Sequence, residues 1–311
     1  MHVTVLLQEA VDALKIKSNG VYIDGTFGFG GHSQRILENL DKKGKLIAFD
    51  RDVSAVARGR SIENRNFHII HSKFSKIKQE LQELGVSQVD GVLLDLGMSS
   101  LQLEDVSRGF SFRLDGPLDM RMDTCEGQTA MEWIASASEA HLGEVIKNYG
   151  EERFAKQIAR EIVMARSRQP ITTTLQLAGI VAKVIRPSKH NNHPATRTFQ
   201  AIRIYLNQEL DELSLTLPDC MKLLKKGGRL VVISFHSLED RTVKCFMREA
   251  SCSDKFPRKL PIRDTDMQHL VHPKLRLVGR AKRPKDSEIE INPRARSAVM
   301  RVAERINVDN L

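Results

Sequence analysis

Short runs of hydrophobic residues, most of them ending at an acid or a glycine, recur through the first hundred residues. Val21–Asp24, Lys45–Asp50, Phe67–Ile70 and Val89–Asp95 are apolar at nearly every position. Runs that are apolar on both faces are typical of buried strands in a parallel sheet. The segments between them, such as 33–39 and 54–63, suit crossover helices. The alternation predicts an α/β fold with a doubly wound sheet.

A fifth strand comes much later, at Arg229–Ser234. The intervening segment is far longer than a crossover requires and has apolar residues at helical spacing. We therefore expect an inserted all-helical domain over residues 112–205, with residues 1–111 and 206–311 forming one discontinuous sheet domain. Residues 199–224 are predicted to form one long helix that returns to the sheet. Residues 275–278 and 298–302 suit a final pair of strands.

Composition narrows the class of protein. The chain has 311 residues with 48 Lys+Arg against 39 Asp+Glu, and residues 255–305 hold 14 of the bases and 6 of the acids. Such a local basic excess favours a polyanionic partner. The four cysteines form no C-x-x-C pair, which fits a reducing cytosol. No apolar run is long enough to span a membrane, and the first residues resemble no targeting signal. We expect a cytoplasmic protein.

The first candidate binding motif is the glycine loop 24–32, Asp-Gly-Thr-Phe-Gly-Phe-Gly-Gly-His, directly after the first strand. Glycines allow close approach of a ligand to the backbone. Gly28 and Gly30 match the first two glycines of a dinucleotide fingerprint, but the third position is Ser33. The loop therefore suits a smaller anion, such as the carboxylate of an amino-acid-like cofactor, better than a pyrophosphate.

Further polar residues follow the next strands. Asp50 ends the second strand, where a carboxylate can accept hydrogen bonds from a ribose, whereas Asp52 suits a helix N-cap or a surface position. Phe74 follows the third strand and could stack on a base or simply pack against a helix. Asp95 ends the fourth strand. Because ligands bind outside the carboxyl ends of parallel strands, these positions predict a nucleoside-binding rim.

Together, the glycine loop, Asp50 and Asp95 resemble the S-adenosylmethionine-dependent methyltransferase fold. Several longer blocks resemble the bacterial 16S ribosomal RNA (cytosine N4)-methyltransferase family, of the MraW type. They are the segments 2–7, 95–103, 108–112, 115–123, 199–204, 234–241 and 292–298. The resemblance covers essentially the whole chain and implies a Rossmann-like methyltransferase sheet.

The resemblance also implies site residues. Gly30, Gly31 and His32 would hold the methionine part of S-adenosylmethionine, and Asp50 its ribose. Phe74 would lie at the adenine, with Asp95 and Gln102 completing the cofactor site. The implied reaction is methylation of the exocyclic N4 of a cytidine in the decoding region of 16S ribosomal RNA. The partner would be that RNA or the small ribosomal subunit, and the helical insert would form part of the substrate cleft.

Catalytic residues are not assigned, because N4 methylation needs alignment rather than a covalent nucleophile. The chain lacks a Pro-Cys motif near the rim, which disfavours carbon-5 chemistry. His236, Arg294 and Arg296 are candidates for substrate binding. An extended chain would place both arginines on one face for phosphate contact. The alternatives are a structural role for His236, which a lone histidine favours, and pairing of the arginines with Glu239 or Asp240.

Other functions remain open from the residues alone. A nicotinamide oxidoreductase would share the glycine loop and Asp50, and a non-catalytic RNA-binding assembly factor would share the basic segment. The pairs His190/His193 and His269/His272 have spacings that a metal could use, but neither has a cysteine nearby, and we expect surface histidines instead. We expect no metal site.

Overall fold

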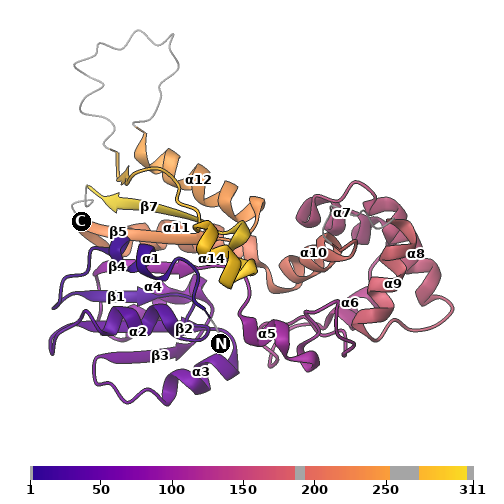
Figure 1. The fold of residues 1–311 in the computed structure, drawn as a ribbon, viewed down its shortest axis with the longest axis horizontal. Helices are drawn as coiled ribbons and strands as arrows, with labels where there is room; N and C mark the ends of the chain where they lie inside the picture. Colours follow the sequence, from indigo (N-terminus) through magenta and orange to yellow (C-terminus); the bar gives the residue numbers. More distant parts are fainter. Residues whose placement is uncertain (1–2, 186–192, 253–272, 307–311) are drawn as a thin grey trace, which may run out of the picture. The chain divides into compact units, whose positions relative to one another are not determined.

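The computed structural model describes residues 3–185, 193–252 and 273–306 of the chain (Figure 1). The chain divides into two compact units. One consists of Met1–Gly97 with Leu210–Leu311, and the other of Met98–Glu209. The first is the sheet unit and the second the helical unit. The sheet unit is thus built from two separate stretches of sequence.

The sheet unit confirms the predicted α/β class. Its first stretch contains α1 (Leu7–Leu14), β1 (Val21–Asp24), α2 (Gly31–Leu37), β2 (Lys45–Asp50), α3 (Val53–Arg60), β3 (Phe67–His71), α4 (Ile77–Glu83) and β4 (Val89–Asp95). Its second stretch contains most of α11 (Glu209–Leu223), then β5 (Leu224–Ser234), α12 (Ser237–Ser251), β6 (Leu275–Leu277), α14 (Asp286–Ile291) and β7 (Val299–Arg305).

The seven strands form one sheet in the order β3-β2-β1-β4-β5-β7-β6. The strands β1 to β5 are parallel, and β7 runs antiparallel to both β5 and β6. The strand order reverses between β1 and β4, because β1 leads outward to β2 and β3 on one side. Crevices of this kind, at the carboxyl ends of the strands, are where open α/β sheets bind ligands.

Both faces of the sheet are covered by helices, which explains why the strands are apolar at successive positions. Residues such as Ile23 and Leu94 face a core with α4, α11 and α12. Their sequence neighbours Tyr22 and Leu93 face a second core with α1 and α2. The period of two along each strand therefore buries alternate side chains on opposite faces. None of the helices in the described ranges has the length and apolar character to cross a bilayer.

The helical unit contains α5 (Ser100–Glu104), α6 (Ala130–Ser136), α7 (Glu139–Gly150), α8 (Ala155–Arg166), α9 (Thr174–Val184) and α10 (Thr196–Asn207). Their buried faces share one core that includes Trp133, Ile146, Ile158 and Ile202. The unit has its own core, as expected for an inserted domain.

The boundaries of this unit differ from the predicted 112 and 205. The structure divides the chain at 97/98 and 209/210. The reason is that Phe110 is buried in the helical core, and Met98, Leu103 and Phe112 pack against it. Sequence periodicity missed them because this segment is mostly turns rather than long helices.

The prediction of one helix over residues 199–224 is wrong. The chain breaks at Gln208, whose φ of 53° lies in the left-handed region, so α10 and α11 are separate helices. Asn207 anchors the end of α10, because its side chain donates to Met120 O (2.8 Å) and accepts from Met122 N (2.7 Å). These bonds tie the helix end to a loop far away in the sequence.

Candidate functional site

The glycine loop joins β1 to α2 and is held by its neighbours on both sides. Phe27 N–H donates to Phe49 O, at the end of β2 (2.9 Å). Thr26 Oγ1 accepts from Asp95 N at the end of β4 (2.6 Å). The loop is therefore fixed to β2 and β4, the two strands that flank β1 in the sheet. Thr26 was not predicted as a site residue, and only its place inside the glycine motif could have indicated it.

Two glycines in this loop are required by its geometry. Gly30 has φ of 81°, and a Cβ there would lie 2.7 Å from the ring of Phe27. Gly31 has no such backbone constraint, but a Cβ there would clash with Thr4 Oγ1. Larger residues would displace the loop. Two of the three positions predicted to hold the methionine part of a cofactor are thus also places where a side chain would disturb the loop.

Asp24 lies beneath the loop and is fully buried. Ser33 Oγ donates to Asp24 Oδ2 (2.6 Å), and Thr26 N–H donates to Oδ1 (3.2 Å). Burial raises the pKa of Asp24 to about 6 despite these bonds. Ser33, which stands where a dinucleotide fingerprint has its third glycine, therefore has a definite role in orienting this acid.

Asp50, at the end of β2, is oriented by two backbone donors. Gly28 N–H donates to Oδ2 (2.7 Å) and Asp52 N–H to Oδ1 (2.8 Å). Each carboxylate oxygen keeps further acceptor capacity, as binding of a diol requires. Burial raises the pKa of Asp50 to about 6. Asp52 is the N-cap of α3, as predicted, and accepts from Ser54 N (2.9 Å).

Asp95 and His32 meet at the switch point. His32 Nδ1 lies 3.5 Å from Asp95 Oδ2, while His32 Nε2 and Asp95 Oδ1 are buried without a hydrogen-bond partner. Burial lowers the pKa of His32 to about 4, so its ring is neutral near pH 7. Burial, with Asp24 and Glu239 nearby, raises the pKa of Asp95 well above its ordinary value. Unpartnered buried polar atoms are costly, and a bound ligand can satisfy them.

The three acids Asp24, Asp50 and Asp95 form no ion pair with Lys or Arg within the described residues. An anionic cluster without a counterion suits a ligand that carries positive charge. The residues therefore fit a small molecule with hydroxyl groups and a cationic centre, such as a sulfonium or ammonium group.

Phe74 and Gln102 have local roles that sequence reasoning left open. Phe74 begins the 3₁₀ turn Phe74–Lys76 and packs, partly buried, against the core beneath α4. Gln102 is buried and accepts from Ser99 N (3.1 Å) in the capping box of α5. It belongs to the helical unit. Contact of either residue with a cofactor stays a prediction.

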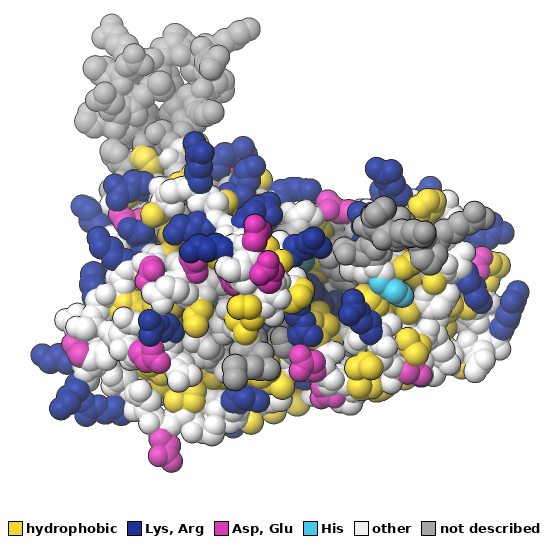
Figure 2. Space-filling model, in the orientation of Figure 1, with side chains coloured by type: hydrophobic (Ala, Val, Ile, Leu, Met, Phe, Trp, Pro, Cys, Tyr) yellow, Lys and Arg dark blue, Asp and Glu magenta, His cyan; other side chains and the backbone are white. Residues whose placement is uncertain are grey.

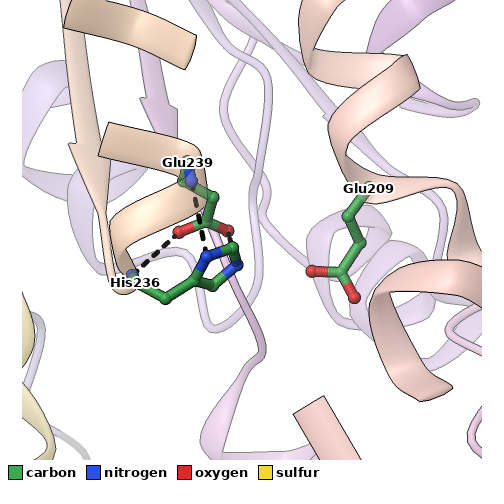
Figure 3. A group of neighbouring side chains, drawn as sticks. All are labelled: Glu209, His236 and Glu239. Atoms are coloured by element: carbon green, nitrogen blue, oxygen red, sulfur yellow. Dashed lines mark hydrogen bonds and ion pairs between the residues drawn. The ribbon is translucent and has the colours of Figure 1, made fainter. Parts of the chain in front are cut away.

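His236 caps α12. Its Nδ1 accepts from Glu239 N–H (3.4 Å), and its Nε2 lies 3.2 Å from Glu239 Oε1, so the two side chains face each other (Figure 3). Glu239 Oε2 accepts in turn from Phe235 N (2.7 Å). This is the structural role considered for His236, and it holds the ring at the carboxyl end of β5. Contact with substrate stays a prediction.

Arg294 and Arg296 are both exposed, but the expectation of an extended chain is wrong. They lie in the 3₁₀ turn Pro293–Ser297, which Asn292 caps by accepting from Arg294 N (3.2 Å). With three residues per turn, side chains two apart point in different directions. Asp240, one of the acids considered as their partner, pairs with Arg301 instead (2.7 and 2.9 Å). His190, His269 and His272 lie outside the described residues.

A doubly wound sheet with glycines and uncompensated carboxylates at its switch point defines a class, the α/β proteins that bind a nucleoside-bearing cofactor at their strand ends. Within that class, comparison with known sequences identifies one family. Residues 1–306 match the MraW methylase family, and the chain belongs to this family.

Relatives agree over the full length. The chain is 63% identical to "Ribosomal RNA small subunit methyltransferase H" of Nitrosospira multiformis over 308 residues, 98% of each chain. It is 59% identical to the protein of the same name from Nitrosomonas eutropha over 313 residues, 100% of this chain and 99% of that one. A solved structure, the putative rRNA-methylase from Clostridium thermocellum, has a TM-score of 0.46 and 11% identity, covering 98% of this chain and 100% of that chain.

Proposed function

We propose that the protein uses S-adenosylmethionine to methylate the exocyclic N4 of a cytidine in the decoding region of 16S ribosomal RNA. The coarser part of this function, methylation of small-subunit ribosomal RNA, follows the family and the names of its relatives. The particular base and atom follow the resemblance in the motif blocks. The substrate is the RNA itself or the small ribosomal subunit, and the protein acts in the cytoplasm.

The observation that carries the proposal is the rim at the switch point, where three acids lack a counterion and two buried polar atoms lack a partner. S-adenosylmethionine supplies an electrophilic methyl group on a cationic sulfur. Gly30 and Gly31 leave room for its amino-acid part, and Asp50 accepts from its ribose hydroxyls. Asp95 stabilises the positive charge, since opposite charges attract strongly where water is largely excluded.

The chemistry asks the protein mainly for alignment. The lone pair of N4 is conjugated with the cytosine ring, so the reaction depends on holding N4 in line with the methyl–sulfur bond. A nitrogen–carbon bond forms as the carbon–sulfur bond breaks, and one N4 proton leaves for solvent or an acceptor. We assign no residue of this chain as that acceptor.

Substrate recognition involves the helical unit and the surface near the rim. A base must leave its stack to reach the methyl group. We propose that the helical unit, residues 98–209, contributes to the substrate cleft and that His236, Arg294 and Arg296 contact RNA. Phosphate contacts would position the RNA without reading its sequence.

Mass spectrometry of ribosomal RNA tests the proposal most directly. RNA from a strain that lacks the protein is expected to lose N4-methylcytidine at one decoding-region position, and the purified protein with S-adenosylmethionine is expected to restore it. An unchanged N4-methylcytidine signal in the deletion strain would support an assembly factor instead. Calorimetric titration with both cofactors separates the remaining alternative, since tight binding of NAD without binding of S-adenosylmethionine would indicate an oxidoreductase.

A further inference from the structure

A line of basic side chains follows α12, outside the site described above. Arg241, Lys244 and Arg248 are exposed and lie three and four residues apart, so they share one face of the helix. The opposite face carries the buried residues Val243 and Met247. α12 starts next to His236, at the carboxyl end of β5, and its 15 residues extend about 22 Å from there.

A second basic element lies close to the first. The segment 280–285 reads Arg-Ala-Lys-Arg-Pro-Lys, and all four basic side chains are exposed. Its backbone is paired with β7, because Lys282 N–H donates to Met300 O (2.9 Å) and Lys282 O accepts from Met300 N–H (2.8 Å). The next residue of β7, Arg301, is joined to Asp240 of α12 by two hydrogen bonds. Both basic elements are therefore attached to adjacent residues of the same strand.

Most basic side chains of this surface are not paired with an acid in the described part of the chain. Within the described ranges, Lys244, Arg248, Lys282 and Arg283 form no ion pair. Asp240 is occupied by Arg301, which leaves Glu249 as the exposed acid of α12. Figure 2 shows dark-blue side chains gathered along the upper edge of the sheet unit, where Figure 1 draws α12. A run of uncompensated positive charge attracts a polyanion and releases its counterions on binding.

We propose that α12 and the segment 280–285 form a phosphate-binding surface for the RNA strand whose nucleotide enters the rim. The inference rests on the proposed function and adds the residues that hold the RNA backbone. The surface begins at the rim and leads away from it, as a track for the nucleotides on one side of the reacting base would. It differs from the Arg294 and Arg296 turn, and its contacts contribute affinity rather than base selection.

Salt-dependent RNA binding by neutral variants tests this surface. The double variants Lys244→Gln/Arg248→Gln and Lys282→Gln/Arg283→Gln would be compared with wild type, using transcribed 16S ribosomal RNA and small ribosomal subunits as probes. The matched control is Lys42→Gln/Lys45→Gln, two exposed lysines at the amino end of β2, far from the strand carboxyl ends. Each test variant and the control lose the same charge.

Each test variant is expected to bind RNA about five- to tenfold more weakly at physiological salt, with KM for RNA raised and kcat little changed. The slope of log Kd against log salt should fall by about 1.4 for two lost phosphate contacts, and the control should match wild type. Affinity for S-adenosylmethionine should be unchanged in all variants.

Two outcomes would overturn the surface without touching the proposed function. One is a wild-type slope and KM in both test variants while wild type still methylates cytidine. The other is loss of binding to vesicles with anionic lipid while RNA binding stays intact, which would make this a membrane-facing surface. Failure of wild type itself to form N4-methylcytidine would instead contradict the proposed function.

Discussion

Strand β4 carries an aspartate near each end, in opposite electrostatic settings. Near the amino end, Asp90 accepts hydrogen bonds from Lys225 Nζ (2.6 Å), Lys17 Nζ (3.1 Å) and Val21 N (3.1 Å). At the carboxyl end, Asp95 has one oxygen 3.5 Å from the neutral ring of His32 and the other without a partner. The same residue type is fully paired at one end and left uncompensated at the other.

The pKa directions follow this difference. Burial alone would raise the pKa of Asp90, but its bonds to Lys225, Val21 and Lys17 bring it below the ordinary value. Burial and two neighbouring acids raise the pKa of Asp95. Asp90 stabilises the fold and has its partners within the protein. Asp95 lacks such partners, as is typical of an acid that interacts with a ligand. Four predictions test this contrast.

The largest effect is expected at β2, where Asp50→Ala removes the acceptor for a cofactor diol. Affinity for S-adenosylmethionine should fall by a factor of about 100 or more, because the Gly28 and Asp52 donors are also released. Calorimetric titration measures this loss. Asp41→Ala, an exposed acid before the amino end of the same strand, should keep wild-type affinity. Retained affinity in Asp50→Ala would show that the ribose assignment is wrong.

The next largest effect is expected at Asp95, as a difference between the affinities for S-adenosylmethionine and for its demethylated product. Asp95→Asn should weaken S-adenosylmethionine about tenfold, since one attractive charge pair is lost, but should change affinity for neutral S-adenosylhomocysteine much less. The variant should also melt at a higher temperature, because it lacks a carboxyl group whose ionised form is disfavoured by burial and by the nearby acids Asp24 and Glu239. An equal loss of affinity for both ligands would mean that Asp95 does not interact with the positive charge of the sulfonium.

A pH series sharpens the contrast between the sheet ends. Asp24 and Asp50 have a pKa of about 6 in the folded protein against 3.8 as the ordinary value. The folded state therefore holds more protons, and the free energy of unfolding from these groups should fall as pH rises from about 4 to 7. Because the lowered pKa of His32 makes the opposite contribution over the same range, chemical denaturation of wild type and of Asp50→Asn at several pH values isolates the part of the fall that comes from Asp50. Saturating S-adenosylmethionine should reduce that part, and identical profiles for the two proteins without cofactor would contradict the raised pKa of Asp50.

The smallest effect is expected at the paired end. Asp90→Asn should cost about 1 kcal/mol of unfolding free energy, since Lys17 and Lys225 are exposed enough to regain water. Because the pKa of Asp90 is lowered, its stabilisation is present above pH 4 and is lost as pH falls through the folded value. Cofactor affinity should be unaffected. If Asp90→Asn lost as much affinity for S-adenosylmethionine as Asp95→Asn, the two ends of β4 would not differ in function.

The sheet and the acids at its strand ends could be predicted from the sequence. Buried parallel strands are apolar at successive positions, and Asp24, Asp50 and Asp95 stand at the ends of such runs. Val21–Asp24, Lys45–Asp50 and Val89–Asp95 are strands with the predicted bounds. The start of β5 was predicted five residues late, at Arg229 rather than Leu224, because Gly227 and Gly228 read as a turn.

What escaped prediction depends on contacts between distant residues. The break at Gln208 accompanies the bonds of Asn207 to the loop at Met120, 87 residues away. Ser33 differs from the glycine that a dinucleotide-binding motif has at this position, and its hydroxyl donates a hydrogen bond to Asp24. Arg294 and Arg296 fall in a turn that Asn292 caps, and Asn292 is itself bonded to Val3 O (3.0 Å) at the other end of the chain. No local pattern contains these partners.

The insertion of residues 98–209 between β4 and β5 also dictates an order of events during synthesis. When β4 leaves the ribosome, its neighbour β5 has not been made, so one edge of a very apolar strand has no partner. At about 5–20 residues per second, the 112 residues of the helical unit take roughly 6–22 s to translate. The β5-facing edge of β4 has no strand partner during that interval, and the sheet can close only once β5 and β7 have emerged.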